Sequence, residues 1–372
     1  MAGGLLGTLP LILGSLSQTP SQLCGLTVIS GGGYGLAILS GYSSVVAASG
    51  DEYGLAFALS MMGAGVGMML LPALTQSLFF IYGWRGAILL LGALNLHSVV
   101  AAATLSPEIL STQLGTHEPS REMAECPATD TVHENESYRE NMKETFGWVH
   151  KIRQAACGHI RAYLNSGRLE IARVILQICF VILAVILYGM IYSGWTIFVV
   201  PDAELKGYLN EDAVLVSVSG GVGNIIGRIM CGLLLRVKQG IFNASSQFIT
   251  MSAVNGVALI VNSATSNFSL LISLAGISGL AIGAGAVLKS LLIMEMFSTE
   301  RRTSSITCAM LSQGLGEVCG GVLSGYLFTI TTSTDSVFLV LGYCSFASSA
   351  LVLLVRLHTA IAELSRKISS PS

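Results

Sequence analysis

Charge is what this sequence lacks most. Lys, Arg, Asp and Glu make up 11% of its 372 residues, about half of the share that is usual in a soluble domain. The net charge is −2, and no basic patch is interleaved with aromatic residues outside one loop, so we expect no binding to nucleic acid. Apolar residues form 52% of the chain and are accompanied by 42 glycines. This combination is typical of closely packed membrane helices.

Sequence motifs of enzymes and secreted proteins are also missing. There is no Walker A sequence, and the glycine-rich string 31–35 lies inside an apolar segment without the context of a nucleotide-binding fold. The eight cysteines form no CxxC pair, which favours single packing thiols over a metal site. We therefore expect no enzymatic activity, no metal and no cofactor. The N-terminus lacks a basic region and a cleavage site, so we expect its apolar segment to be retained.

Long apolar runs dominate the rest of the chain. A helix needs about 20 mostly apolar residues to cross the hydrocarbon core of a bilayer. Runs of this kind occur at approximately 2–17, 22–46, 54–80, 85–105, 174–199, 214–235, 247–264, 268–296, 303–328 and 336–356. The sequence therefore predicts an all-α polytopic membrane protein with about ten spanning helices.

One long polar stretch divides these runs into four and six. Residues 106–168 are rich in Glu and Arg and predict a solvated loop that is partly disordered. We expect an N-terminal bundle of four spans at 1–105, the loop at 106–168, a C-terminal bundle of six helices at 169–356, and a tail at 357–372.

Basic residues predict the orientation, because cytoplasmic loops carry an excess of Lys and Arg. If the long loop is cytoplasmic, the opposite side holds only Arg85 and Lys206 among the loop cations. The cytoplasmic side then holds Arg121, Arg139, Lys143, Lys151, Arg153, Arg161, Arg168, Arg173, Arg236, Lys238, Arg301, Arg302, Arg356, Arg366 and Lys367. We therefore expect both termini in the cytoplasm and the loop around Lys206, with Asp202 and Glu204, to be a solvated outer loop without a function.

The stretch from Tyr82 to His97 contains the sequences Gly-Trp-Arg-Gly-Ala and Asn-Leu-His. It is similar to the entry into the sixth helix of the monocarboxylate transporter family, which belongs to the major facilitator superfamily. Further similar segments are 31–37 (fourth helix), 55–67 (fifth), 217–228 (eighth), and 313–316 with 320–325 (eleventh). The resemblance implies a two-bundle fold in which the ten runs match helices three to twelve of a twelve-helix pattern.

The resemblance also carries departures from the family. It implies that the first two helices, including a substrate-binding lysine in the first, are absent from this chain. Before the fifth helix the family has a basic cluster, whereas residues 47–54 are shorter and acidic. Several proton-coupled members have an aspartate four residues before the arginine of the eighth helix, where this chain has Asn224, which cannot titrate.

Arg228 is the strongest candidate for substrate binding. An unpaired guanidinium in a spanning helix costs at least roughly 2.5–3.5 kcal/mol, so it requires a partner or a wet cavity. The resemblance assigns this arginine to the carboxylate of the substrate, for which a planar fork is well suited. The alternative is a structural pair with a neighbouring helix end. Asn224 lies one turn earlier on the same face and either joins this site or bonds between helices.

Three residues of the tenth helix of the pattern share one face, which the family uses to line its pathway. They are Ile282, Ala286 and Lys289. Lys289 either adds a second positive charge to an anion site or extends along the helix to the membrane interface. Glu317, in the eleventh helix, either pairs with Arg228 or Lys289, acts as a titrating group in proton coupling, or faces another polar helix surface.

Two functions agree with these observations. The first is transport of a small organic anion, most simply a monocarboxylate, by alternating access and with a possible proton link, in the plasma membrane. The second is a truncated, non-transporting isoform or a regulatory partner of a full-length transporter. The resemblance implies a single-span glycoprotein partner for some members of the family, and the substrate and the bilayer are the other expected partners.

Overall fold

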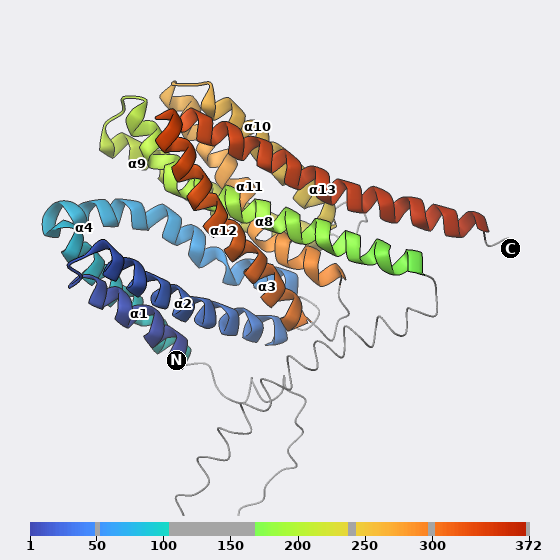
Figure 1. The fold of residues 1–372 in the computed structure, drawn as a ribbon, viewed down its shortest axis with the longest axis horizontal. Coiled ribbons are helices and arrows are strands. Elements are labelled where there is room, and N and C mark those ends of the chain that lie inside the picture. Colours follow the sequence, from blue (N-terminus) through green and yellow to red (C-terminus); the bar gives the residue numbers. More distant parts are fainter. Residues whose placement is uncertain (49–52, 104–167, 237–242, 297–301, 370–372) are drawn as a thin grey trace, which may run out of the picture. The chain divides into compact units, whose positions relative to one another are not determined.

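The computed structural model describes residues 1–48, 53–103, 168–236, 243–296 and 302–369. These residues are almost entirely helical, with no β-strand among them (Figure 1). An all-α membrane fold is thus confirmed. The helices are α1 (Ala2–Gly14), α2 (Pro20–Ala48), α3 (Tyr53–Ser60), α4 (Met62–Asn95), α5 (His97–Ala103), α8 (Arg168–Leu205), α9 (Asn210–Arg236), α10 (Ala244–Ser263), α11 (Phe268–Met296), α12 (Arg302–Thr331) and α13 (Thr334–Ser369).

Within the described residues, eight helical stretches are long and apolar enough to cross a membrane. One of them, Leu55–Ala103, has 49 residues and contains both of the spans predicted at 54–80 and 85–105. The two arms meet at Gly83, whose φ of 66° and ψ of 179° interrupt α4. Only glycine adopts this backbone conformation readily, which explains why a helix reverses here without a loop. The first predicted span is shorter than expected, because α1 has 13 residues and extends over only about 20 Å.

The predicted loop and tail have different outcomes. Most of the loop at 106–168 lies outside the described residues, as do residues 49–52 of the acidic segment before α3. The tail predicted from residue 357 continues the helix α13 to Ser369.

Glycines set the distances between the helices. α9 and α11 pack against each other along most of their length, and a Cβ atom at Gly227 would lie 2.0 Å from the carbonyl oxygen of Leu280. At Gly279 it would lie 1.9 Å from the carbonyl oxygen of Gly220, and at Gly283 it would lie 2.2 Å from that of Asn224. The backbones of α9 and α11 are therefore in direct contact at these positions, where any side chain larger than that of glycine would clash. The contacts also establish that the two helices run in the same direction.

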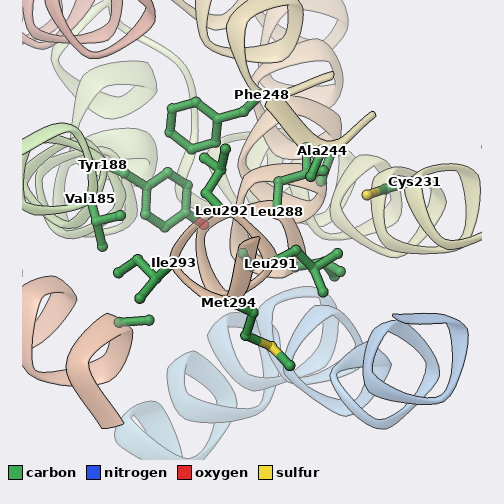
Figure 2. Close-up of a cluster of buried hydrophobic side chains, with 14 of the residues drawn as sticks. Val185, Tyr188, Cys231, Ala244, Phe248, Leu288, Leu291, Leu292, Ile293 and Met294 are labelled. Carbon is green, nitrogen blue, oxygen red and sulfur yellow. The ribbon is translucent and has the colours of Figure 1, made fainter. Parts of the chain in front are cut away.

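A buried apolar cluster surrounds the C-terminal half of α11 and includes side chains from α8, α9 and α10. Figure 2 shows Tyr188 and Val185 from α8 and Phe248 from α10 around Leu288 and Leu292 of α11. Leu288 and Phe248 are 0% exposed. Burial of each such side chain stabilises the fold by about 1.5–3 kcal/mol relative to its exposure to water. The cluster therefore holds α11 firmly, and with it the polar residues that α11 carries.

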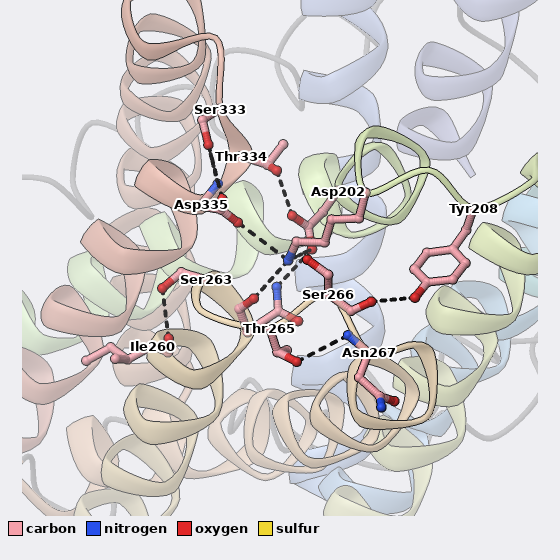
Figure 3. Close-up of polar contacts among 12 residues, drawn as sticks. Asp202, Tyr208, Ile260, Ser263, Thr265, Ser266, Asn267, Ser333, Thr334 and Asp335 are labelled. Atoms are coloured by element: carbon pink, nitrogen blue, oxygen red, sulfur yellow. Dashed lines mark hydrogen bonds and ion pairs between the residues drawn. The ribbon is translucent and has the colours of Figure 1, made fainter.

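The loop around Lys206 differs from the prediction, because it is part of a buried polar network (Figure 3). Asp202 is 3% exposed and accepts hydrogen bonds from Lys206 Nζ at 3.0 Å, Asn262 Nδ2 at 2.9 Å and Thr334 Oγ1 at 2.6 Å. Lys206 also donates to the carbonyl oxygen of Asn262 at 2.8 Å and lies 3.5 Å from Asp335 Oδ1. This network joins the end of α8 to the end of α10 and the start of α13. The prediction of a merely solvated loop is therefore wrong for Asp202 and Lys206, although Glu204 is exposed.

Candidate functional site

Arg228 and Asn224 form a buried pair on α9. Arg228 is 2% exposed and Asn224 is 0% exposed. Because they are four residues apart, their side chains lie above one another on one face of the helix, and Arg228 Nε donates to Asn224 Oδ1 at 2.8 Å. Gly65 of α4 lies directly over the pair, since a Cβ atom there would be 3.1 Å from Asn224 Oδ1. The pair thus lies where the N-terminal and C-terminal helices meet.

Hydrogen-bonding capacity is left over at this pair. Arg228 Nη1 and Asn224 Nδ2 are both buried and have no hydrogen-bond partner in the part of the chain that the structure describes. A buried donor without a partner costs about 1–3 kcal/mol, and more when it is charged. Arg228 forms no ion pair with any described carboxylate. The alternative role of Arg228, a structural pair with a helix end, therefore finds no support among these residues.

Lys289 brings a second buried cation close to the pair. It is 1% exposed, which excludes the alternative that its side chain extends to the membrane interface. Its Nζ lies 5.7 Å from the centre of the Tyr188 ring, a distance at which the ring face attracts a cation. Arg228 and Glu317 are close enough to act electrostatically on Lys289.

Glu317 is the acidic residue of this region. It is partly buried, and its Oε1 accepts a short hydrogen bond from Gln313 Nε2, one turn earlier on α12. It forms no ion pair with Arg228 or Lys289 in the described structure, so the predicted direct pairing is not observed. α12 approaches α8 closely here, because a Cβ atom at Gly189 would lie 3.1 Å from the Glu317 nitrogen.

Three tyrosines complete the group, and all three stand out in the sequence as aromatic residues within spanning helices that either pack or line a pathway. Tyr188 donates to the carbonyl oxygen of Ile282 at 2.7 Å and stacks on Tyr192, with ring centres 6.5 Å apart. Tyr192 lies within electrostatic reach of Glu317 and Arg228. Tyr42, from α2, lies within reach of Arg228 and packs against Phe57. The i, i+4 spacing of Tyr188 and Tyr192 was a signal in the sequence, whereas the approach of Tyr42 depends on tertiary packing.

The other predicted residues of α11 lie beside the group. Ile282 and Ala286 are 1% and 5% exposed and belong to the packed apolar clusters. The structure therefore brings together Arg228, Asn224 and Lys289 as polar members, with Glu317 at their border. Ile282 contributes its carbonyl oxygen as the anchor of Tyr188.

An apolar groove of about 410 Å³ also lies between α1 and α2. Its lining carries no charged side chain: Leu13, Leu16, Ser17, Gln22, Gly25, Leu26 and Ile29. The described residues contain no group of three or more His, Cys, Asp or Glu residues that could hold a metal ion. The polar group around Arg228 is therefore the candidate site.

This arrangement favours an anion, because its positive groups are buried among apolar helices. Within the described residues, the site holds two cations and an amide donor without a partner, and the nearby carboxylate of Glu317 accepts a hydrogen bond from Gln313. Electrostatic attraction is much stronger away from water, and the fork of Arg228 is suited to a planar carboxylate. Residues of the site come from α2, α8, α9, α11 and α12, so the site includes helices from both halves of the described chain.

Comparison with known proteins agrees with a fold of this type. A sequence profile described as the Major Facilitator Superfamily matches residues 1–254, which is more than half of the chain. The chain therefore belongs to the major facilitator superfamily, a class of membrane transporters, and it is an integral membrane protein.

Within that superfamily, the chain is similar to monocarboxylate transporters. It is 26% identical to monocarboxylate transporter 12 of Rattus norvegicus over 359 residues, which cover 95% of this chain and 70% of the relative. It is 25% identical to the human protein of the same name, over 96% of this chain and 67% of the relative. It is also 25% identical to human monocarboxylate transporter 6, over 91% of this chain and 62% of the relative. The resemblance drawn from the sequence motifs is thus confirmed.

Proposed function

We propose that this chain transports small organic anions that carry a carboxylate, with monocarboxylates as the simplest substrates. The observation that carries the proposal is the buried pair of Arg228 and Asn224, each with a donor that finds no partner in the described parts of the chain. Similarity to proteins named monocarboxylate transporters supports the same class of substrate. Transport proceeds by alternating access, in which the two bundles move around a site near the middle of the membrane.

The remaining parts of the proposal concern orientation and coupling. The distribution of Lys and Arg favours cytoplasmic termini, and the plasma membrane is the location that we propose. Because Asn224 cannot take up a proton, a proton-linked cycle in this chain would use Glu317, which is close enough to act electrostatically on Lys289.

The decisive experiment is uptake of a labelled monocarboxylate into liposomes that contain the purified chain. Arg228→Lys retains the charge but loses the planar fork, and we expect it to reduce uptake about ten-fold or more, since hydrogen bonds to charged groups contribute roughly 1.5–3 kcal/mol. The matched control is Arg85→Lys, because Arg85 stacks on Trp84 away from the site.

Two results would speak against the proposal. Equal losses in the Arg228 and Arg85 variants would indicate a general effect on folding. Absence of uptake by the unaltered chain, with correct folding shown by a sharp thermal unfolding transition, would favour the second hypothesis, a regulatory partner of another transporter.

A further inference from the structure

Lys289 has no obvious structural reason to carry a charge where it lies. It is among the largest fully buried side chains of the described structure, and its neighbours on α11, Leu288 and Leu291, belong to the apolar cluster of Figure 2. A methionine or leucine would fill this position without the cost of removing an ammonium group from water, which amounts to several kcal/mol. The charge therefore requires a partner.

No described side chain provides that partner. Lys289 forms no ion pair in the part of the chain that the structure describes, and its identified contact is the ring face of Tyr188. Glu317 is the acidic group that acts on it, but the carboxylate of Glu317 is bound by Gln313 instead. A cation–π contact supplies about 2 kcal/mol when it is desolvated, which is less than the cost of burial.

Lys289 also lies close to Arg228 along the helix axis. The glycine contacts place Gly227 of α9 beside Leu280 and Ala284 of α11. Since the two helices run in the same direction, Arg228 is level with the turn that follows Ala284. Lys289 is then about one turn further along, a separation of roughly 5–7 Å at 1.5 Å per residue. Neither cation has a carboxylate partner among the described residues, and Arg228 is close enough to act electrostatically on Lys289.

We infer that Lys289 binds a second acidic group of the substrate, so that the site selects short dicarboxylates over monocarboxylates. One carboxylate occupies the fork of Arg228 with the free amide of Asn224, and the other pairs with Lys289 beside the Tyr188 ring. The inference rests on the proposed function, because it assigns the substrate class of the same site. It extends the proposal from one carboxylate to two, and makes Lys289 the residue that determines specificity.

The test compares three labelled anions in liposomes that contain the purified chain. Succinate carries two carboxylates, monomethyl succinate has nearly the same skeleton with one, and propionate is a simple monocarboxylate. We expect the unaltered chain to take up succinate with the lowest KM. Lys289→Gln should raise the KM of succinate about ten-fold or more, and leave the KM of monomethyl succinate and of propionate unchanged. Lys289→Arg should restore the preference for succinate, because it restores the charge.

Folding is controlled separately. Thermal unfolding of Lys289→Gln should occur at the same temperature as that of the unaltered chain or higher, because removal of a buried charge is not expected to destabilise the protein. If the variant does not fold, the comparison of the three anions is made with Lys289→Met, which fills the same volume.

The outcomes separate this inference from the proposed function. Uptake of propionate that depends on Arg228, without uptake of succinate, would overturn the inference and leave the proposed function standing. An equal change in KM for all three anions in Lys289→Gln would also overturn it, since a merely structural role does not distinguish substrates. If no anion is taken up by the folded chain, both proposals fall.

Discussion

At the scale of single residues, the chain buries two cations that have no acidic partner among the described residues. Arg228 and Lys289 are 2% and 1% exposed, and both lie among apolar helices where an uncompensated cation is costly. Evolutionary loss of such charges would stabilise the fold, so their presence points to a ligand. The pair of Arg228 and Asn224 is a direct result of helical periodicity, because four residues make slightly more than one turn.

A prediction at this scale concerns Glu317. If transport is proton-linked, uptake of an anion accompanies entry of a proton and therefore decreases as the external pH rises. Glu317→Gln keeps the hydrogen bond to Gln313 but cannot take up a proton. We expect its uptake to be nearly independent of pH, measured between about pH 5.5 and 8 with the membrane potential held at zero.

The control for this experiment is Glu211→Gln, which changes an exposed carboxylate in the first turn of α9. It should preserve the pH profile of the unaltered chain. A profile that is equally steep in Glu317→Gln would exclude Glu317 as the coupling group.

At the scale of helices, buried polar contacts join ends that are distant in the sequence. Asp202 bonds to Asn262, which is 60 residues away, and to Thr334, which is 132 residues away. Lys206 pairs with Asp202, and their side chains are 9% and 4% exposed. This network holds the ends of α8, α10 and α13 together.

Asp202→Ala tests this role. It leaves Lys206, Asn262 and Thr334 without their common acceptor, and breaking a buried pair in this way typically costs about 3–5 kcal/mol. We expect a clear decrease in the unfolding temperature of the purified chain in detergent. Glu204→Gln, which alters an exposed carboxylate two residues away, should have little effect. Equal unfolding temperatures for the two variants would show that the network does not stabilise the bundle.

The positions of the helices were largely predictable, because each span needs its own long apolar run and glycine interrupts them where the chain reverses. The burial of Asp202 and Lys206 could not be predicted from the sequence. A charged residue at a helix end is solvated or buried depending on which other helix ends pack against it. The same holds at the site. The spacing of Asn224 and Arg228 is visible in the sequence, but the approach of Tyr42 from α2 and of Glu317 from α12 requires the packed helices.

At the scale of the whole molecule, the candidate site lies between helices of the two predicted bundles. α4 covers Asn224 through Gly65, and α3 contacts α9 where a Cβ atom at Gly232 would lie 2.9 Å from Ala58 Cβ. α9 in turn packs along α11, which carries Lys289. Movement of one bundle against the other therefore changes access to the site and must also change the contact between Ala58 and Gly232.

A disulfide at that contact should therefore stop transport. In a chain whose native cysteines are replaced by serine, Ala58→Cys together with Gly232→Cys would place two Cβ atoms 2.9 Å apart. The helices then need to separate by only about 1 Å to reach the roughly 3.8 Å that a disulfide requires. We expect oxidation to abolish uptake and a reductant to restore it. The matched control is Ser193→Cys with Gly321→Cys, where a Cβ atom at Gly321 lies 3.4 Å from Ser193 Oγ. Both of these positions belong to the C-terminal bundle, so oxidation should leave uptake intact. Full uptake by the oxidised Ala58 and Gly232 variant would mean that these two helices keep their contact throughout the cycle, and that access to Arg228 opens elsewhere.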